Sequence, residues 1–189
     1  IIDFDSTFVQ VEALDELARI ALLGRKDKNK RVKKIEDITK LGMEGKLSFR
    51  ESLSRRLELF SPDKKDLIEL IKLLKKSVTK SIKRNKAFFR EYADSIYIIS
   101  GGFREYILPV VAPFGIREDH ILANSFIFNS RGKIIGFDKN NPLSQDQGKV
   151  KQVKKLRLAG EVVVVGDGFT DYQIKKDGVA HKFFLFTEN

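Results

Sequence analysis

Three short apolar segments, each followed at once by a polar cluster, constrain the fold of this chain most strongly. Residues 96–99 and 162–165 are apolar or aromatic throughout, and the first residues of the chain end a similar segment. The clusters that follow are 3–7, 100–102 and 166–171. Strands that are apolar on both faces are typical of parallel sheets covered by helices. Because ligands of such sheets bind beyond the carboxyl ends of the strands, we expect the three clusters to meet in one crevice.

The segment 12–76 has a helical pattern throughout. Its apolar residues recur at intervals of three and four, which is the spacing of one helix face. Ser48 followed by Glu51 predicts one helix start, and Ser61 before Pro62 predicts another. We therefore expect about four helices here, followed by alternating strands and helices to the end of the chain.

The composition excludes several classes of site. The chain has 189 residues, no Cys and two His. A disulfide scaffold, a thiol nucleophile and a cysteine-ligated zinc site are therefore excluded, and carboxylates are the expected ligands of any cation. No apolar run approaches ~20 residues, so we expect no membrane span. With no apolar leader at the start, we expect a soluble, cytoplasmic protein.

The net charge of +10 raises the alternative of nucleic-acid binding. Basic residues are densest at 25–34 and recur from 64 to 90, where many alternate with Asp and Glu. This alternation is typical of solvated helix faces, and no nucleic-acid-binding motif accompanies it. We therefore do not expect nucleic acid to be the main partner, and the oligomeric state stays open.

Acidic residues at the predicted strand ends favour a cation site. In an extended segment, Asp3 and Asp5 project to the same side, and two carboxylates so close repel unless a cation or a proton separates them. Asp167 adds a third carboxylate from another strand end. An oxygen-rich site of this kind suits Mg²⁺. The alternative is that each cluster only caps a helix or forms a turn, which does not explain why all three stand at strand ends.

Ser100, Gly101 and Lys149 supply groups that suit an anion. Glycines let a backbone approach a ligand closely, and the amides at the start of a following helix point at an anion. The Ser100 hydroxyl adds a donor. Lys149 begins a basic helix and can neutralise both a phosphate and Asp3, with Lys151 as the alternative lysine. The competing interpretation is a plain tight connection and a surface lysine.

Taken together, these segments resemble the haloacid dehalogenase-like hydrolases. The segments similar to the four motifs of that family, in the same order, are Asp3-Phe4-Asp5-Ser6-Thr7, Ser100-Gly101-Gly102, Lys149, and Gly166-Asp167-Gly168 with Asp171. The forms Asp-x-Asp-Ser-Thr and Ser-Gly-Gly-Phe are closest to its phosphoserine phosphatase branch. The resemblance implies an α/β fold. Its Rossmann-like three-layer core, with a largely parallel sheet, would comprise 1–11 and 78–189, and a helical-bundle cap inserted after the first strand would comprise 12–77.

The resemblance also implies roles for the residues of the site. Asp3 would form an aspartyl-phosphate, and Asp5 would act as general acid and then as general base. Lys149 would hold the phosphoryl oxygens together with Ser100 and Gly101. Mg²⁺ would be bound by Asp3, Asp167 and the backbone carbonyl of Asp5, and Asp171 would order the metal site from behind these ligands.

Four residues of the helical segment stand where that branch binds its substrate: Glu12, Met43, Phe49 and Arg56. Arg56 can bind a carboxylate through two hydrogen bonds, and Glu12 can pair with an ammonium group. A phosphorylated amino acid would thus be held at both ends of its backbone. The alternative is that Glu12 and Arg56 are exposed charges, and that Met43 and Phe49 only pack within the cap.

The resulting prediction is an Mg²⁺-dependent phosphomonoesterase that hydrolyses L-phosphoserine, a reaction of serine biosynthesis. One alternative keeps the mechanism and changes the substrate to another small phosphate ester. The other is a non-catalytic, basic binding or regulatory module that retains the fold.

Overall fold

Five extended segments form a parallel sheet at the centre of the structure, a computed structural model that describes residues 1–188 except for the side chain of Met43. In order, they are β6 (Lys182–Leu185), β5 (Val163–Gly166), residues 1–3, β1 (Ile98–Phe103) and β2 (Ile121–Asn124). The N-terminal segment joins the two strand pairs because Ile2 bridges both Ile98 and Val165. The first residues therefore form the middle of the sheet, and Asp3 lies at its carboxyl edge.

Helices cover both faces of this sheet, as the apolar strands predict. Ile98 packs on one face with α7 (Arg104–Val111). Ile99, its neighbour, packs on the other face with α8 (Gly148–Leu156) and α9 (Phe169–Lys176). Successive residues of a strand point to opposite faces, so an uninterrupted apolar strand fills both layers. The predicted three-layer α/β arrangement is confirmed.

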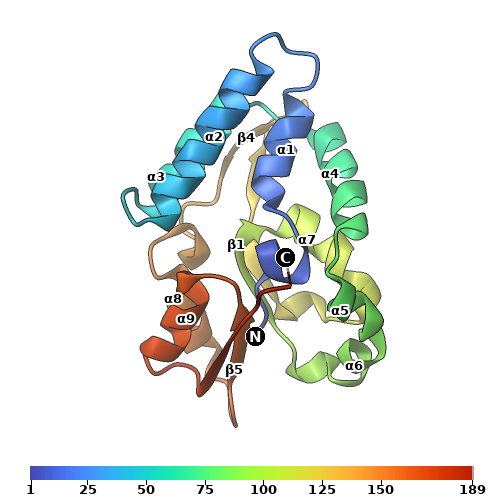
Figure 1. The fold of residues 1–189 in the computed structure, drawn as a ribbon, viewed down its shortest axis with the longest axis vertical. Coiled ribbons are helices and arrows are strands. Elements are labelled where there is room, and N and C mark those ends of the chain that lie inside the picture. Colours follow the sequence, from blue (N-terminus) through green and yellow to red (C-terminus); the bar gives the residue numbers. More distant parts are fainter. Residues whose placement is uncertain (189) are drawn as a thin grey trace.

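Four helices form the segment 12–76, as predicted. They are α1 (Ala13–Ala21), α2 (Lys28–Met43), α3 (Phe49–Leu59) and α4 (Lys64–Lys76). Figure 1 shows them gathered at one end of the molecule, beyond the carboxyl edge of the sheet. The shorter helices α5 (Lys80–Arg84) and α6 (Lys86–Glu91) then lead towards β1.

The start of α4 differs from the prediction, whereas the start of α3 agrees with it. Ser48 caps α3 by accepting a hydrogen bond from the Glu51 amide at 3.2 Å. The predicted start at Ser61 is wrong, because α4 begins at Lys64 and is capped by Asp63. Asp63 and Asp66 each accept a hydrogen bond from the other's backbone amide. This reciprocal pair satisfies two free amides of the helix end at once.

The cluster at 100–102 lies inside the end of β1 and does not form a separate turn. β1 continues to Phe103, which pairs with Asn124 of β2 after a shift in register. The Asn124 side chain donates to the Gly101 carbonyl at 2.8 Å, so a polar side chain replaces a regular ladder contact at this bulge. The first amides of α7 consequently begin beyond Phe103 rather than directly after Gly102.

An antiparallel hairpin and several short turns complete the fold. The hairpin consists of β3 (Phe126–Phe128) and β4 (Ile134–Phe137). Its second strand contacts the α3–α4 connection, since the Ile134 amide donates to the Pro62 carbonyl at 2.9 Å. The 3₁₀ turns are Ala93–Ser95, Ala112–Phe114, Glu118–His120 and Pro142–Ser144.

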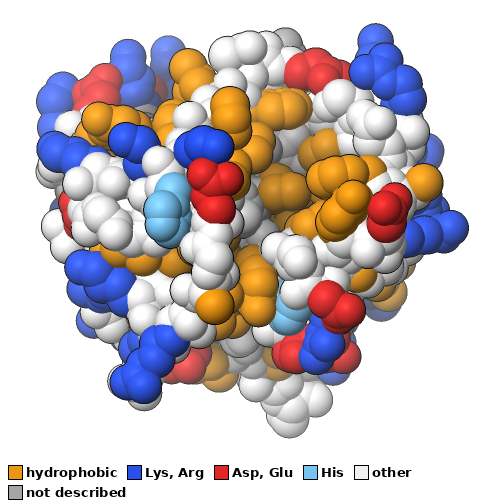
Figure 2. All heavy atoms as spheres, turned by 90° about the horizontal axis from the view of Figure 1, so that it is seen from below, with side chains coloured by type: hydrophobic (Ala, Val, Ile, Leu, Met, Phe, Trp, Pro, Cys, Tyr) orange, Lys and Arg blue, Asp and Glu red, His pale blue; other side chains and the backbone are white. Residues whose placement is uncertain are grey.

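The end of the molecule opposite α2 and α3 exposes hydrophobic side chains in several groups, and Lys and Arg lie mainly around its periphery (Figure 2). On this face the positive charge is dispersed, unlike the continuous basic groove that tracks a nucleic-acid backbone. Among residues 1–188, no helix combines the length and the apolar character that crossing a membrane requires.

Candidate active site

A cavity of about 690 Å³ lies between the carboxyl edge of the sheet and the helices α1 to α3. Its walls include ten of the residues that the sequence singles out: Asp3, Asp5, Glu12, Phe49, Arg56, Ser100, Gly101, Lys149, Asp167 and Asp171. The remaining one is Met43, whose side chain lies outside the described part of the structure. Segments far apart in the chain thus meet around one cavity, as the strand-end argument predicts, while the role of each residue stays a prediction.

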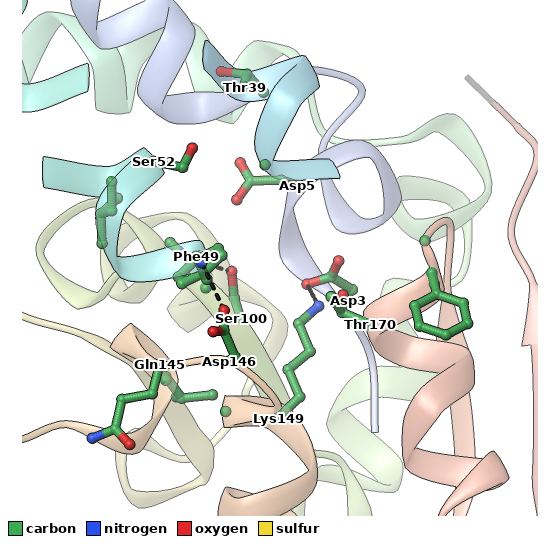
Figure 3. A pocket seen from close by; sticks show the side chains of 18 of the residues that line it. Asp3, Asp5, Thr39, Phe49, Ser52, Ser100, Gln145, Asp146, Lys149 and Thr170 are labelled. Atoms are coloured by element: carbon green, nitrogen blue, oxygen red, sulfur yellow. Dashed lines mark hydrogen bonds and ion pairs between the residues drawn. The ribbon is translucent and has the colours of Figure 1, made fainter. Parts of the chain in front are cut away.

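A tight turn after the first strand places both N-terminal aspartates in the cavity. Phe4–Phe8 form a single π-helical turn, in which Ser6 has a left-handed backbone (φ 52°). Asp3 Oδ1 accepts the Phe4 amide at 2.7 Å, and Asp5 Oδ1 accepts the Ala13 amide at the start of α1 at 2.8 Å. Figure 3 shows the Asp5 carboxylate pointing between the helices that carry Thr39 and Ser52 and the end of β1 at Ser100. Backbone donors therefore fix the orientation of both carboxyl groups.

Lys149 is the lysine that reaches the aspartates. Its ammonium lies 2.8 Å from Oδ1 of Asp3 (Figure 3) and 2.8 Å from Oδ1 of Asp171. Burial by itself lowers the pKa of Lys149, but the carboxylates of Asp171 and Asp3 raise it above its usual value, so the lysine stays charged. Lys151 is exposed, and its ammonium lies near Gln145 at 3.4 Å. The geometry therefore favours Lys149 over Lys151, and the role of Lys149 stays a prediction.

A glycine allows the helix that carries Lys149 to approach the core closely. A Cβ on Gly148 would overlap the carbonyl oxygen of Pro142, which belongs to the 3₁₀ turn just before α8. The backbone of α8 therefore starts in direct contact with this turn. This contact brings the first turn of α8, and Lys149 with it, to the edge of the sheet.

Three carboxylates cluster beside Lys149. Oxygen atoms of Asp3, Asp167 and Asp171 all lie within 4.8 Å of one another. Burial raises the pKa of Asp3, and Asp171 adds to this effect, while Lys149 opposes it. Burial also raises the pKa of Asp167, again with a contribution from Asp171. The cluster thus holds more negative charge than the single ammonium neutralises.

This cluster fits Mg²⁺. Within the described residues, the buried Oδ2 of Asp171 accepts no hydrogen bond, and an orphaned carboxylate oxygen of this kind is a ligand that hard cations prefer. The resemblance places Asp171 behind the metal ligands, whereas the geometry brings one of its oxygens into the same group as Asp3 and Asp167. Which of these carboxylates bind the ion directly stays a prediction.

Asp5 and Glu12 form a second acidic pair in the lining of the cavity. Burial raises the pKa of Asp5 to about 8, and the charge of Glu12 contributes to this rise. Burial raises the pKa of Glu12 as well, although the Ser6 hydroxyl opposes this effect by donating to Oε1 at 2.7 Å. Asp5 is therefore protonated near neutral pH, which is the state that a general acid requires.

Arg56 is 7% exposed, so it is not a surface charge. Its Nη1 donates to the Thr39 hydroxyl at 3.2 Å and lies 3.6 Å from Oδ1 of Asp15. Its Nε is buried and has no hydrogen-bond partner among the described residues. Arg56 thus lines the cavity from the helical segment, and a planar guanidinium suits an anionic ligand.

Phe49 closes the cavity over the Ser-Gly-Gly segment. A Cβ on Gly101 would lie 2.6 Å from the tip of the Phe49 ring, so the ring occupies the space that this glycine leaves open. The Phe49 amide donates to Oδ1 of Asp146 at 2.7 Å (Figure 3). Beside it, the Ser100 hydroxyl oxygen accepts the Gly102 amide at 2.9 Å. The site is therefore formed by both the helical segment and the core.

The structure adds residues that the sequence reasoning missed. Thr7 is fully buried and its hydroxyl lies 3.5 Å from Oδ1 of Asp167, and Ser6 orients Glu12. Both residues belong to the first motif, residues 3–7, so their position in that motif is enough to predict that they lie at the site. Asp146 and the buried Tyr106 also line the cavity, and neither stands in a motif or at a telling spacing.

This chain is similar to known proteins over most of its length. A phosphoserine phosphatase of Arabidopsis thaliana, described as chloroplastic, is 34% identical over 187 residues, which cover 97% of this chain and 61% of that protein. A phosphoserine phosphatase of Drosophila melanogaster is 29% identical, and the alignment covers 90% of this chain and 62% of that protein. The chain therefore spans about three fifths of the length of these two relatives.

A solved structure also resembles this one closely. The crystal structure of a phosphoserine phosphohydrolase-like protein from Francisella tularensis superposes with a TM-score of 0.85 at 34% identity, covering 98% of this chain and 85% of that one. The model of the haloacid dehalogenase-like hydrolases matches residues 1–175, a range that contains all four motif segments around the cavity. On the strength of this match, the chain belongs to the haloacid dehalogenase-like hydrolase family.

Proposed function

We propose that this protein is an Mg²⁺-dependent phosphomonoesterase that hydrolyses L-phosphoserine to serine and phosphate. The observation that carries the proposal is that one cavity holds two different sets of charged groups. Lys149 and the carboxylates around it lie on the core side, whereas Glu12 and the buried Arg56 come from the helical segment. The first set suits a phosphate with a cation, and the second suits an ammonium and a carboxylate. Phosphoserine carries all three groups.

The chemistry proceeds in two displacements at phosphorus. The Asp3 carboxylate attacks the phosphorus, the bond between phosphorus and the serine oxygen breaks, and Asp5 donates its proton to the departing oxygen. The product on the enzyme is an aspartyl-phosphate. Asp5, now ionised, then accepts a proton from a water whose oxygen attacks the phosphorus. The bond to Asp3 breaks, and phosphate leaves.

The geometry of Asp3 supports its role as nucleophile. Its Oδ1 receives both the Phe4 amide and the Lys149 ammonium, while Oδ2 receives no hydrogen bond from the residues described. One oxygen thus holds the carboxylate in place and the other is available to react. Lys149, Ser100 and the Gly101 amide would hold the phosphoryl oxygens, where the placement of charge does most of the catalytic work.

Asp3, Asp167 and the backbone carbonyl of Asp5 would hold the metal ion, with Asp171 ordering them. Bound Mg²⁺ would offset the repulsion between the Asp3 carboxylate and the anionic phosphate. Without a cation, the buried cluster has three carboxylates for one ammonium. This imbalance gives the protein a reason of its own to bind a divalent ion.

Two domains would share the site. We assign residues 1–11 and 78–189 to the hydrolase core and residues 12–77 to a cap. This division is supported by the cavity itself, since Glu12, Phe49 and Arg56 of the cap line it opposite the aspartates of the core. A closed cap would exclude bulk water from the reacting phosphate.

The names of the related proteins support the choice of substrate. The Arabidopsis and Drosophila relatives are phosphoserine phosphatases by name. A solved structure described as a phospho-aspartyl intermediate analogue of phosphoserine phosphatase superposes with a TM-score of 0.72 at 25% identity. The buried acidic cluster argues against a non-catalytic module, because three repelling carboxylates destabilise a fold that does not use them.

The test is phosphate release from L-phosphoserine with Mg²⁺, with EDTA, and by an Asp3→Asn variant. We expect release by the unmodified protein with Mg²⁺ only, and a loss of roughly 10³-fold or more in kcat for Asp3→Asn. Asp37→Asn, an exposed aspartate on α2, is the matched control and should be fully active. Equal release by Asp3→Asn and the unmodified protein would refute the mechanism, and activity confined to substrates without a carboxylate would refute the choice of phosphoserine.

A further inference from the structure

Two residues of neighbouring helices hold the guanidinium of Arg56. Its Nη1 donates to the Thr39 hydroxyl of α2 at 3.2 Å and lies 3.6 Å from Oδ1 of Asp15 in α1. The Thr39 hydroxyl also lies 3.1 Å from the same Asp15 oxygen, to which it can donate. The helices α1, α2 and α3 therefore meet in one small polar network, whose charged members are Asp15 and Arg56.

This network is largely buried, so its two charges depend on each other. The side chains of Arg56 and Asp15 are only 9% and 12% exposed. A buried charge is strongly unfavourable unless it is paired. Burial raises the pKa of Asp15, whereas the charge of Arg56 and the Thr39 hydroxyl oppose this rise. Asp15 is therefore the counter-charge of a guanidinium that the cap could not otherwise bury at low cost.

Asp15 supports the wall of the cavity and is not part of it. Arg56 and Thr39 line the cavity, and Asp15 does not. Asp15 therefore acts on a ligand in the cavity through these two residues rather than by contact. Because the guanidinium is planar, the two contacts at Nη1 restrict the orientation of its other N–H groups. Among these, Nε has no partner within the described residues.

We propose that Asp15 is a positioning residue, which together with Thr39 holds the Arg56 guanidinium in the orientation that binds the substrate carboxylate. The inference rests on the proposed function, in which Arg56 binds that carboxylate, and it extends this function to a residue outside the cavity. In the same scheme Lys149 holds the phosphate on the core side. Loss of Asp15 should therefore weaken the binding of the amino-acid part of the substrate and leave the binding of phosphate unchanged.

The experiment measures kcat and KM for L-phosphoserine, and the inhibition constant of inorganic phosphate, for Asp15→Ala and the unmodified protein. We expect KM to rise roughly tenfold, within the range of a lost hydrogen bond to a charged group, while kcat changes less than about threefold. The inhibition constant of phosphate should stay within about twofold, since phosphate has no carboxylate for Arg56 to bind. Asp15→Asn keeps an acceptor oxygen for Thr39 and should give an intermediate KM.

A double-variant cycle with Arg56→Ala shows whether Asp15 acts through Arg56. Residues that act through one another have non-additive effects. Arg56→Ala alone should raise KM at least as much as Asp15→Ala does, and the double variant should raise it no further. Asp15→Ala leaves a buried guanidinium unpaired and should lower the melting temperature, whereas the double variant removes both charges and should recover part of the loss. If Asp15→Ala does not fold, Asp15→Asn takes its place in the cycle.

Glu36→Ala is the matched control for a purely structural effect. Glu36 also connects α2 with α1 through an ion pair with an arginine, in this case Arg19, but the side chains of Arg19 and Glu36 are 45% and 44% exposed. Exposed ion pairs contribute little to stability. Glu36→Ala should therefore leave both KM and the inhibition constant of phosphate unchanged.

A rise in KM that is absent from the Arg56→Ala background supports the inference, and three results would overturn it. An unchanged KM for Asp15→Ala would show that Arg56 needs no support from Asp15. An equal rise in KM and in the inhibition constant of phosphate would show a general disturbance of the cavity. Additive effects in the cycle would show that Asp15 acts elsewhere than on Arg56.

Failure of the proposed function gives different results. If the unmodified protein does not hydrolyse phosphoserine, the choice of substrate is wrong. If Arg56→Ala leaves KM unchanged, the assignment of the carboxylate to Arg56 is wrong. In both cases the inference fails with the proposal on which it rests, whereas each of the three results above leaves that proposal intact.

Discussion

The backbone amide of Phe49 donates a hydrogen bond to the side chain of Asp146 at 2.7 Å, across 97 positions of the chain. Phe49 begins α3, whereas Asp146 stands three residues before Lys149, so the bond links a helix of the proposed cap to the loop that positions the lysine. Arg50 reinforces the link by donating to the Lys139 carbonyl at 2.7 Å. The Phe49 ring then lies over Gly101. The closure of the cavity thus depends on contacts at its rim.

Removal of this link should weaken substrate binding without unfolding the protein. We expect Asp146→Ala to raise KM for phosphoserine by about two- to tenfold, the equivalent of one ordinary hydrogen bond, with kcat changed little. Asp146→Asn keeps an acceptor oxygen and should stay close to the unmodified protein. Steady-state kinetics of the two variants test this. An equal KM for Asp146→Ala and the unmodified protein would contradict the role of the link.

Gly101 should tolerate no side chain while Phe49 is in place. A Cβ at this position would lie 2.6 Å from the Phe49 ring, so Gly101→Ala must displace the ring and open the cavity. We expect kcat/KM to fall by roughly tenfold or more, in line with a loss of about 1–3 kcal/mol from overpacking.

Two further variants separate this contact from a general effect of alanine. In the double variant Gly101→Ala/Phe49→Leu, a smaller side chain replaces the Phe49 ring. This variant should regain part of the kcat/KM that Gly101→Ala loses. Gly136→Ala, where a Cβ would meet no atom within 4 Å, should have no effect on kinetics. Full activity of Gly101→Ala would show that the ring moves away at no cost.

Much of this arrangement follows from sequence alone, because each signal is local. The position of Asp3 and Asp167 at strand ends follows from apolar runs that end in polar residues, although β1 runs on through Ser100 to Phe103, and a parallel sheet then brings these ends together. The start of α3 at Ser48 follows from one capping residue at the correct spacing. In both cases, a few neighbouring residues are enough to predict the feature.

Other features depend on contacts that no local pattern contains. Ser61 and Asp63 are both acceptable caps for α4, and only the reciprocal pairing with Asp66 decides between them. The approach of Asp146 to Phe49 and the burial of Tyr106 beside Gly102 depend on how distant elements pack. Periodicity and spacing carry no information on such pairs, so the closure of the cavity could not be predicted from them.

Loss of the Lys149 ammonium should destabilise the fold as well as abolish activity. Lys149→Met leaves the buried carboxylates of Asp3 and Asp171 without their counter-charge. Breaking a buried ion pair from one side costs about 3–5 kcal/mol, so the denaturation midpoint should fall clearly. Lys151→Met, two residues along the same helix and exposed, is the matched control. A midpoint that falls equally in both variants would indicate a general effect on α8 rather than the loss of the buried pair.

Glu105 offers a test of burial outside the site. This half-buried residue accepts the Phe126 amide through Oε1 at 2.9 Å, and its buried Oε2 has no partner within residues 1–188. Burial raises the pKa of Glu105, so the charged form is less favourable in the folded state than in the unfolded chain. The resulting penalty is absent below the ordinary pKa of Glu, about 4.3, and develops as the pH rises above it.

Neutralising Glu105 should therefore stabilise the protein at neutral pH and lose its benefit in acid. We expect Glu105→Gln to raise the free energy of unfolding at pH 7 by up to about 1 kcal/mol, because an amide is less costly to bury than a carboxylate and its oxygen can still accept the Phe126 amide. The gain should become much smaller at pH 4, where the carboxyl is mostly protonated in both states. Denaturant titrations at the two pH values, with the exposed Glu91→Gln as control, measure the difference. A gain that is larger at pH 4 than at pH 7 would reverse the sign and show that the charged carboxylate stabilises the fold.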